Sequence, residues 1–273
     1  MMTRYICFNG VFADAAFPAI DAANKSYRYG DGFFETLRVH HGQIPLWDLH
    51  RDRILRSMSL LGYAFAEGIT IEGLYAQLLE LCVRNQCAAQ ARVRLSFSNG
   101  NGGLFDQSCV YYLAEAHPFT TPDADEGISL GVYDELQKDA HRFSALKLSS
   151  GFIYSRAAQF CKRQGWDDCV IQNKAGSIIE TVISNLFWIK NGSIFTPPVA
   201  DGCVEGVFRS YLLAAEPQIT ERSCTRELLE EADELFLTNA LRGIRKVRAF
   251  NGKTYTSDQT VALLSRHQQL RLE

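Results

Sequence analysis

The chain has 273 residues and a formal net charge of −3, and 47% of its residues are hydrophobic while 22% are charged. This length accommodates one large or two medium-sized domains with sizeable cores, and the composition is that of an ordinary globular protein. The small negative charge and the lack of a dominant basic stripe argue against a nucleic-acid partner. No apolar run approaches the length of a membrane span, so no membrane partner is expected.

The eight cysteines are scattered along the chain, with no CxxC pair and no histidine at ligand spacing from them. We therefore expect no metal site. Widely spaced thiols are typical of a reducing compartment. The apolar patch Tyr5–Phe8 near the N-terminus is too short for a signal peptide. The sequence thus predicts a cytoplasmic protein.

The first hundred residues predict strands mixed with two helices. A helix is expected over 46–62, where Leu49, Ile54, Met58 and Leu61 form an apolar stripe and Gly62 ends it. The remaining predictions for this part are strands at 5–8, 33–40, 91–98 and 110–116, and a second helix at 71–85.

The segment 118–125 concentrates proline, threonine and aspartate between two patterned stretches, which is typical of a linker. It predicts an N-terminal domain over 1–117, a linker over 118–125 and a C-terminal domain over 126–273.

The second half alternates strands and helices without a regular repeat. Asn191-Gly192 between two apolar runs indicates a type I′ hairpin, and Gly165 is expected to end a helix. The predicted strands are 128–133, 169–172, 177–183, 186–190, 193–196 and 234–238, and the predicted helices are 152–164, 206–215, 228–231 and 258–270. The pattern predicts an α+β protein.

Two charged residues stand in unusually apolar surroundings. Lys147 lies within Ser144–Leu148, and Glu180 lies within the β-branched run 177–183, both of whose faces are apolar. Buried charges need a partner or a task. A desolvated lysine loses its proton more easily and can form a Schiff base, while a buried carboxylate can pair with a protonated ring nitrogen. Together they suggest the two ends of pyridoxal phosphate.

Six short segments occur in an order that resembles a known family. They are Tyr29–Glu35, His50-x-x-Arg53, Lys147, Glu180 with Ser184–Phe187, Thr196–Pro198 and Gly206–Arg209. Nearly the whole chain resembles the class IV (fold type IV) pyridoxal-phosphate enzymes, which include branched-chain aminotransferases, D-amino-acid aminotransferases and aminodeoxychorismate lyases. The resemblance implies two domains, a small N-terminal α/β domain and a larger C-terminal domain with a strand-rich pseudo-barrel.

The resemblance also implies roles for individual residues. Lys147 is expected to carry the Schiff base and move protons, and Glu180 to keep the pyridine nitrogen protonated. The other expected cofactor-binding residues are Arg53, Val207, Phe208, Asn239 and Ala240, with the backbone amides of Val207 and Phe208 cradling the phosphate. Relatives are homodimers, so a homodimer is expected.

The substrate side leaves alternatives open. Tyr29, Phe34 and Arg38 match pocket residues of relatives, and either Arg92 or Arg94 is a candidate for the substrate carboxylate. We expect an aminotransferase acting on a branched-chain-like amino acid and a 2-oxo acid. A near-equal alternative is an aminodeoxychorismate lyase that forms 4-aminobenzoate, which the tripeptide Asn239-Ala240-Leu241 favours. A remote alternative is a non-catalytic protein that binds the cofactor.

Overall fold

A computed structural model describes residues 4–106, 108–120 and 126–267. Its helices and strands form two compact units. Within the described residues, unit 1 comprises 4–106, 108–120 and 146–151, and unit 2 comprises 126–145 and 152–267. The segment Leu146–Gly151, which the sequence analysis assigned to the C-terminal domain, therefore belongs to unit 1. Residues 121–125 of the expected linker lie outside the described residues, and Pro118 is the last residue of a strand.

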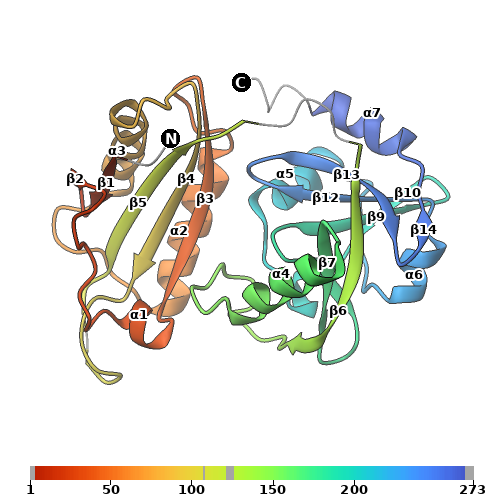
Figure 1. Cartoon of the computed structure of the whole chain (residues 1–273), viewed down its shortest axis with the longest axis horizontal. Coiled ribbons are helices and arrows are strands. Elements are labelled where there is room, and N and C mark those ends of the chain that lie inside the picture. Colours follow the sequence, from red (N-terminus) through yellow and green to blue (C-terminus); the bar gives the residue numbers. More distant parts are fainter. Residues whose placement is uncertain (1–3, 107, 121–125, 268–273) are drawn as a thin grey trace. The chain divides into compact units, whose positions relative to one another are not determined.

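Unit 1 is a five-stranded antiparallel sheet with the order β2-β1-β5-β4-β3. Two long helices cover one face of it (Figure 1). The strands are β1 (Tyr5–Phe8), β2 (Val11–Asp14), β3 (Gly32–His40), β4 (Gln90–Ser98) and β5 (Tyr111–Pro118), and the helices are α1 (Lys25–Tyr29), α2 (Trp47–Leu61) and α3 (Ile71–Arg84). The predicted strands and long helices are present within one or two residues, while β2 and the five-residue α1 were not predicted.

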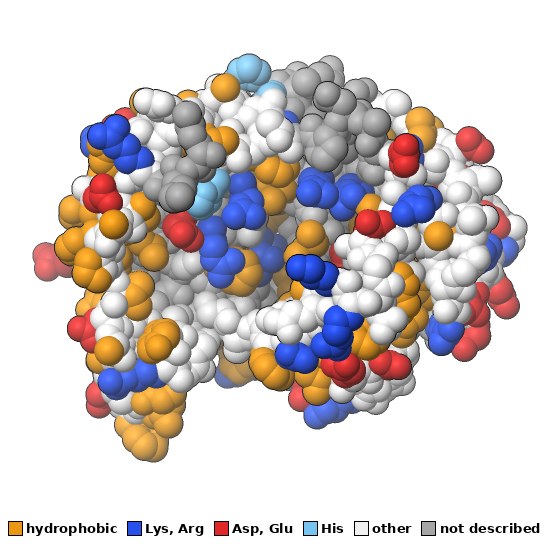
Figure 2. Space-filling model, in the orientation of Figure 1, with side chains coloured by type: hydrophobic (Ala, Val, Ile, Leu, Met, Phe, Trp, Pro, Cys, Tyr) orange, Lys and Arg blue, Asp and Glu red, His pale blue; other side chains and the backbone are white. Residues whose placement is uncertain are grey.

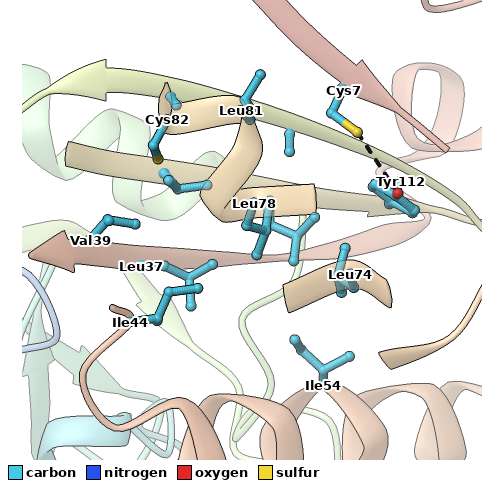
Figure 3. Close-up of a cluster of buried hydrophobic side chains, with 14 of the residues drawn as sticks. Cys7, Leu37, Val39, Ile44, Ile54, Leu74, Leu78, Leu81, Cys82 and Tyr112 are labelled. Atoms are coloured by element: carbon cyan, nitrogen blue, oxygen red, sulfur yellow. Dashed lines mark hydrogen bonds between the residues drawn. The ribbon is translucent and has the colours of Figure 1, made fainter. Parts of the chain in front are cut away.

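The core of unit 1 lies between the sheet and the helices α2 and α3. Figure 3 shows Ile54 of α2 pointing toward Leu74 of α3, with Leu37 of β3 and Leu78 of α3 in the same cluster. All four side chains are fully buried. Burial of each contributes about 2 kcal/mol, which explains why the alternation of β3 and the stripe of α2 appear so clearly in the sequence.

Unit 2 is built around a nine-stranded mixed sheet with the order β11-β10-β9-β12-β13-β6-β7-β8, in which β14 pairs with β13. Its strands are β6 (Ile128–Lys138), β7 (Asp168–Asn173), β8 (Ile178–Thr181), β9 (Asn185–Lys190), β10 (Ser193–Thr196), β11 (Thr220–Glu221), β12 (Glu234–Asn239), β13 (Gly243–Phe250) and β14 (Lys253–Thr254). Its helices are α4 (Phe152–Gln164), α5 (Val207–Ala215), α6 (Arg226–Glu231) and α7 (Asp258–Arg266), with a short 3-10 turn η1 (Val199–Asp201).

The sheet of unit 2 curls until its two edges meet. Ile178 of the edge strand β8 forms an isolated bridge with Cys224, which follows the opposite edge strand β11, and the Ile178 amide donates to the Cys224 carbonyl over 2.8 Å. The expected strand-rich pseudo-barrel and the α+β class are therefore confirmed. Figure 1 shows the curled strands of this unit in green to blue.

Three features of unit 2 differ from the sequence prediction. Strand β13 was missed because Arg245, Lys246 and Arg248 interrupt its apolar alternation. Strand β6 continues to Lys138 instead of ending at Tyr133, through a polar stretch that has no burial pattern. In addition, β6 and β7 are parallel neighbours joined by α4, so one strand–helix–strand unit exists where no such alternation was expected.

Other predictions hold closely. Helix α4 has the predicted bounds, and Asn191 and Gly192 both have positive φ, 50° and 77°, as a type I′ turn requires. The last helix is observed to Arg266, and the part of its prediction beyond residue 267 lies outside the described residues. Within the described residues, no helix is long and apolar enough to cross a membrane.

Candidate active site

Lys147 is held against the first residues of β3. Its carbonyl accepts a hydrogen bond from the Phe34 amide over 2.9 Å, the Ser149 amide donates to the Gly32 carbonyl over 2.9 Å, and Leu148 bridges Phe33. The Lys147 side chain is half-buried, and its Nζ lies 4.6 Å from the centre of the Phe34 ring. The backbone contacts fix where this amine stands in unit 1.

A buried ion pair lies in the same unit. Arg53 on α2 donates from Nε to Glu35 Oε1 over 2.7 Å and from an Nη to Glu35 Oε2 over 2.6 Å, and His50 Nδ1 lies 2.8 Å from the same Oε2. Burial by itself would raise the pKa of Glu35, but Arg53 and His50 hold that pKa at about 2. Burial lowers the pKa of His50, and Arg53 and Lys147 add to this, against the opposing effect of Glu35. The sequence analysis identified Arg53 but assigned no role to Glu35.

Four of the five candidate substrate residues share one face of β3 and β4, and the fifth, Tyr29, lies on α1. Arg38 stands opposite Arg92, and Thr36 stands opposite Arg94, while Val93 between the two arginines is fully buried on the other face. Strand β4 is an interior strand of the sheet, between β5 and β3. Figure 2 shows Lys and Arg side chains, in blue, gathered over this part of unit 1.

Like charges directly opposite each other on neighbouring strands are destabilising without an anion. Arg38 is almost completely buried, Arg92 is exposed and Arg94 is half-buried. The Arg94 guanidinium lies 3.8 Å from the centre of the Phe34 ring, the same ring that Lys147 contacts. Tyr29, at the end of α1, is exposed. The face therefore offers cationic groups suited to a carboxylate.

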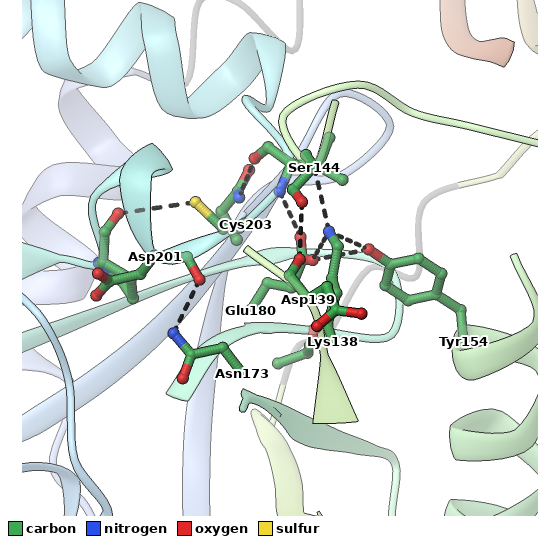
Figure 4. A network of polar contacts seen from close by, with 12 residues as sticks. Lys138, Asp139, Ser144, Tyr154, Asn173, Glu180, Asp201 and Cys203 are labelled. Carbon is green, nitrogen blue, oxygen red and sulfur yellow. Dashed lines mark hydrogen bonds and ion pairs between the residues drawn. The ribbon is translucent and has the colours of Figure 1, made fainter. Parts of the chain in front are cut away.

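Glu180 lies in unit 2, within the buried strand β8. Its Oε1 accepts from Lys138 Nζ and from the Tyr154 hydroxyl, each over 2.8 Å, and its Oε2 accepts from the Val204 amide over 2.9 Å (Figure 4). The predicted burial of this carboxylate is correct. Neither Lys138 nor Tyr154 was identified from the sequence, because Lys138 lies on the part of β6 that was not predicted.

The start of α5 has the properties of a phosphate cradle. Among the described residues no side chain caps this helix, so its first amides, from Val207 onward, are not occupied by a capping group. A Cβ atom built on Gly206 would lie 1.9 Å from Asn185 Oδ1, so the close approach requires glycine here. The Asn185 amide in turn donates to the Val204 carbonyl over 2.8 Å, which fixes the loop in front of the helix.

A buried hydroxyl lies on the strand face that Asn185 shares. Thr238 pairs with Asn185 across β12 and β9, and the next pair on that face is Phe236 with Phe187. Among the described residues, Thr238 Oγ1 has no hydrogen-bond partner although the residue is almost fully buried. An orphaned hydroxyl of this kind needs an acceptor. Together with the amides of α5 it fits the phosphate of the expected cofactor, and the sequence analysis missed it.

The side chain of Asn239, one of the expected cofactor-binding residues, forms its hydrogen bonds near its own loop. Asn239 Oδ1 accepts from the amides of Leu241 and Arg242, at 3.1 and 2.9 Å, and its amide donates to Ser184 Oγ over 3.1 Å. Ala240 is half-buried and offers only its backbone. Asn239 therefore shapes the loop, and Val207 and Phe208 are both buried at the start of α5.

The fold also brings together a set of potential metal ligands that the spacing of the sequence did not indicate. The ligand atoms of Cys161, Asp168 and Cys169 lie within 4.8 Å of one another and all three residues are buried. The Asp168 oxygens already accept from the Thr181 hydroxyl and from the amides of Cys169 and Val182. This carboxylate is thus occupied in holding β7 to β8.

The chain is similar to known proteins along most of its length. The pattern of the family described as "Amino-transferase class IV" matches residues 32–250. The chain is 24% identical to the aminodeoxychorismate lyase of Vibrio harveyi, covering 92% of this chain and 94% of that protein. It is 25% identical to the D-alanine aminotransferase of Bacillus licheniformis, covering 92% and 90%. The branched-chain aminotransferase of Thermoproteus uzoniensis, solved with norvaline, superposes with a TM-score of 0.85 at 22% identity, covering 98% and 95%.

The family match and the fold define a fold type IV enzyme dependent on pyridoxal phosphate, as the resemblance implied. The chain belongs to the class IV aminotransferase family. Its activity is that of an aminotransferase or an aminodeoxychorismate lyase.

Proposed function

We propose that the chain is an aminotransferase that moves an amino group between a branched-chain-like amino acid and a 2-oxo acid, with Lys147 as the residue that holds the cofactor. The position of Lys147 carries this proposal, because three backbone contacts fix its segment against β3, the strand that also bears Glu35 of the buried Glu35–Arg53 pair.

When bound, pyridoxal phosphate supplies an aldehyde carbon for an amine and a ring that withdraws electrons from the substrate α-carbon. Lys147 would hold that aldehyde and would move the proton at the substrate α-carbon. Glu180 would accept a hydrogen bond from the ring nitrogen. The amides of Val207 and Phe208 and the Asn239–Ala240 loop would hold the phosphate.

Arg53 contributes to the same phosphate. A guanidinium carries five N–H donors in a fixed plane, and the two hydrogen bonds to Glu35 keep that plane in one orientation. On the substrate side, Arg38, Arg92 and Arg94 provide cations for the carboxylate, and Phe34 and Tyr29 provide the neighbouring surface.

The alternative is an aminodeoxychorismate lyase that releases 4-aminobenzoate. The tripeptide Asn239-Ala240-Leu241 favours it, since lyases resemble that sequence and Asn239 closes the loop through three hydrogen bonds. The identity to the Vibrio lyase and the identity to the Bacillus aminotransferase, 24% and 25%, are nearly the same, so an assay has to decide.

We further propose a homodimer in the cytoplasm. Unit 1 exposes several large hydrophobic side chains, among them Phe17, Tyr27, Leu104 and Phe105, and the last of these is 99% exposed. Exposed apolar side chains of this size support an interface between two copies of the chain. All eight cysteines are free, which is compatible with a reducing compartment.

One experiment tests the proposal. The purified protein is loaded with pyridoxal phosphate and incubated with leucine plus 2-oxoglutarate, and separately with aminodeoxychorismate. Glutamate is the expected product, and 4-aminobenzoate in its place would establish the alternative. If the loaded protein forms neither product, the chain either binds the cofactor without catalysing these reactions or acts on another amine.

The role of Lys147 is tested on the same samples. Borohydride is expected to attach the cofactor covalently to the wild-type chain and to Lys190→Met, a matched variant whose lysine forms an exposed ion pair with Asp233. Lys147→Ala is expected to show neither attachment nor the protein-bound absorbance. Covalent attachment in Lys147→Ala would refute the assignment.

A further inference from the structure

The last residue of β6 occupies the centre of the polar network around Glu180. Lys138 Nζ donates to Glu180 Oε1 over 2.8 Å, to the Tyr154 hydroxyl over 2.7 Å and to the Ser144 carbonyl over 3.2 Å. We propose that Lys138 is a positioning residue for Glu180, which it keeps ionised and turned toward the ring of the cofactor. This inference rests on the role of Glu180 proposed above.

The burial of Lys138 and Glu180 argues against a purely structural role for this ion pair, because desolvating the two charges costs free energy. The side chains of Lys138 and Glu180 are only 14% and 5% exposed. Removing two such charges from water costs several kcal/mol per ion, and well-packed apolar side chains would stabilise the barrel at least as well. All three donors of the ammonium are used, so the geometry is tightly specified.

The hydrogen bonds of Glu180 leave a defined position for one more donor. A carboxylate offers about four acceptor positions. Lys138 and Tyr154 occupy Oε1, and the Val204 amide takes one position on Oε2. The remaining position on Oε2 is the one suited to a ring N–H, and Figure 4 shows Lys138 and Tyr154 together at the other oxygen of the carboxylate.

Lys138 supplies the cation of this hydrogen-bond set. Burial, followed by the charge of Glu180, raises the pKa of the Tyr154 hydroxyl, which therefore remains a neutral donor. Burial, followed by Glu180, likewise raises the pKa of the Cys203 thiol to about 12. Without Lys138, the hydrogen-bond partners of the desolvated carboxyl would all be neutral, and no cation would offset its charge.

The third hydrogen bond of Lys138 reaches the segment that precedes Lys147. Ser144 lies three residues before Lys147 in the chain, and its hydroxyl closes the turn after β6 by donating to the Asp139 carbonyl over 2.7 Å. One ammonium thus contacts both the Glu180 carboxylate and the turn that follows β6.

The first test measures the ionisation of Glu180 directly in cofactor-free protein. The carbon-13 shift of its carboxyl group is followed from pH 8 to pH 5 in glutamate-labelled protein, with Glu180→Gln identifying the signal. The wild-type signal is expected to stay constant, as is that of Lys138→Arg. The signal of Lys138→Met is expected to move within this range. Lys138→Gln, which retains a donor without the charge, gives the same answer should the methionine variant not fold.

The second test uses the loaded enzyme. Lys138→Met is expected to lower kcat at least tenfold while KM changes less than threefold, and Lys138→Arg is expected to restore kcat to within threefold of the wild type. Lys190→Met serves as the control, because its exposed ion pair lies outside the network. A carboxyl signal that stays constant in both Lys138→Met and Lys138→Gln would overturn the inference. Loss of cofactor binding by the wild-type chain would instead refute the proposed function and leave the carboxyl titration intact.

Discussion

Arg53 binds both carboxylate oxygens of Glu35 in the interior of unit 1, with its Nε 2.7 Å from Oε1 and an Nη 2.6 Å from Oε2. A two-pronged pair of this kind fixes the plane of the guanidinium as well as its position. It therefore determines which nitrogens of Arg53 are presented to a phosphate, and it connects the stability of unit 1 to its function.

The pH dependence of stability should report this pair. The pKa of Glu35 is lowered from 4.5 to about 2, so its stabilising effect is complete above pH 4.5 and is lost as the pH falls toward 2. The shift corresponds to about 3 kcal/mol at neutral pH. The free energy of unfolding, measured with urea, is expected to fall more between pH 7 and pH 3.5 in the wild type than in Glu35→Gln. Equal losses in the two proteins would contradict the assignment.

Thr238→Val should separate stability from cofactor binding. The buried hydroxyl has no partner among the described residues, so its replacement by a methyl group is expected to leave the cofactor-free protein equally stable or to stabilise it by about 1 kcal/mol. Affinity for pyridoxal phosphate, measured by absorbance titration, is expected to fall roughly fivefold through the lost hydrogen bond to the phosphate.

Thr260→Val is the matched control for that substitution. Its buried hydroxyl donates to Glu234 over 2.7 Å, so this variant should lose stability and keep its cofactor affinity. The prediction fails if Thr238→Val binds the cofactor as tightly as the wild type does.

Gly206→Ala should displace the start of α5. The added Cβ would meet Asn185 Oδ1 at 1.9 Å, and one of the two must move. We expect cofactor affinity to fall at least tenfold. Asn185→Ala combined with Gly206→Ala removes the clashing atom and should recover part of the loss, whereas no effect of Gly206→Ala alone would show that the amides of α5 do not hold the phosphate.

Arg94 is the expected partner of the substrate carboxylate. Burial lowers its pKa, Glu115 opposes this, and its guanidinium is stacked on Phe34. Loss of one charged hydrogen bond costs about 2 kcal/mol, or roughly thirtyfold in KM. Steady-state kinetics of Arg94→Gln should show this rise, while Arg84→Gln, which breaks an exposed pair with Glu80, should not. A normal KM for Arg94→Gln would direct attention to Arg38 or Arg92.

The local sequence pattern was sufficient to predict most helices and strands and to select Lys147 and Glu180 as candidate residues. Apolar periodicity predicted α2, α3 and α4, and Asn191-Gly192 predicted the turn between β9 and β10, because these signals depend on neighbours within a few residues. The apolar surroundings of Glu180 indicated its burial for the same reason. The order of six motifs indicated the family.

Other features depended on residues far apart in sequence. The pairs of Glu35 with Arg53 and of Glu180 with Lys138 join residues 18 and 42 positions apart, and the register of β12 against β9 places Thr238 beside Asn185. A polar residue at the end of a strand carries no local pattern that reveals its partner. The sequence by itself thus determined the family and the candidate side chains, whereas the tertiary structure decided their charge, orientation and support, since those follow from contacts made only when distant segments pack together.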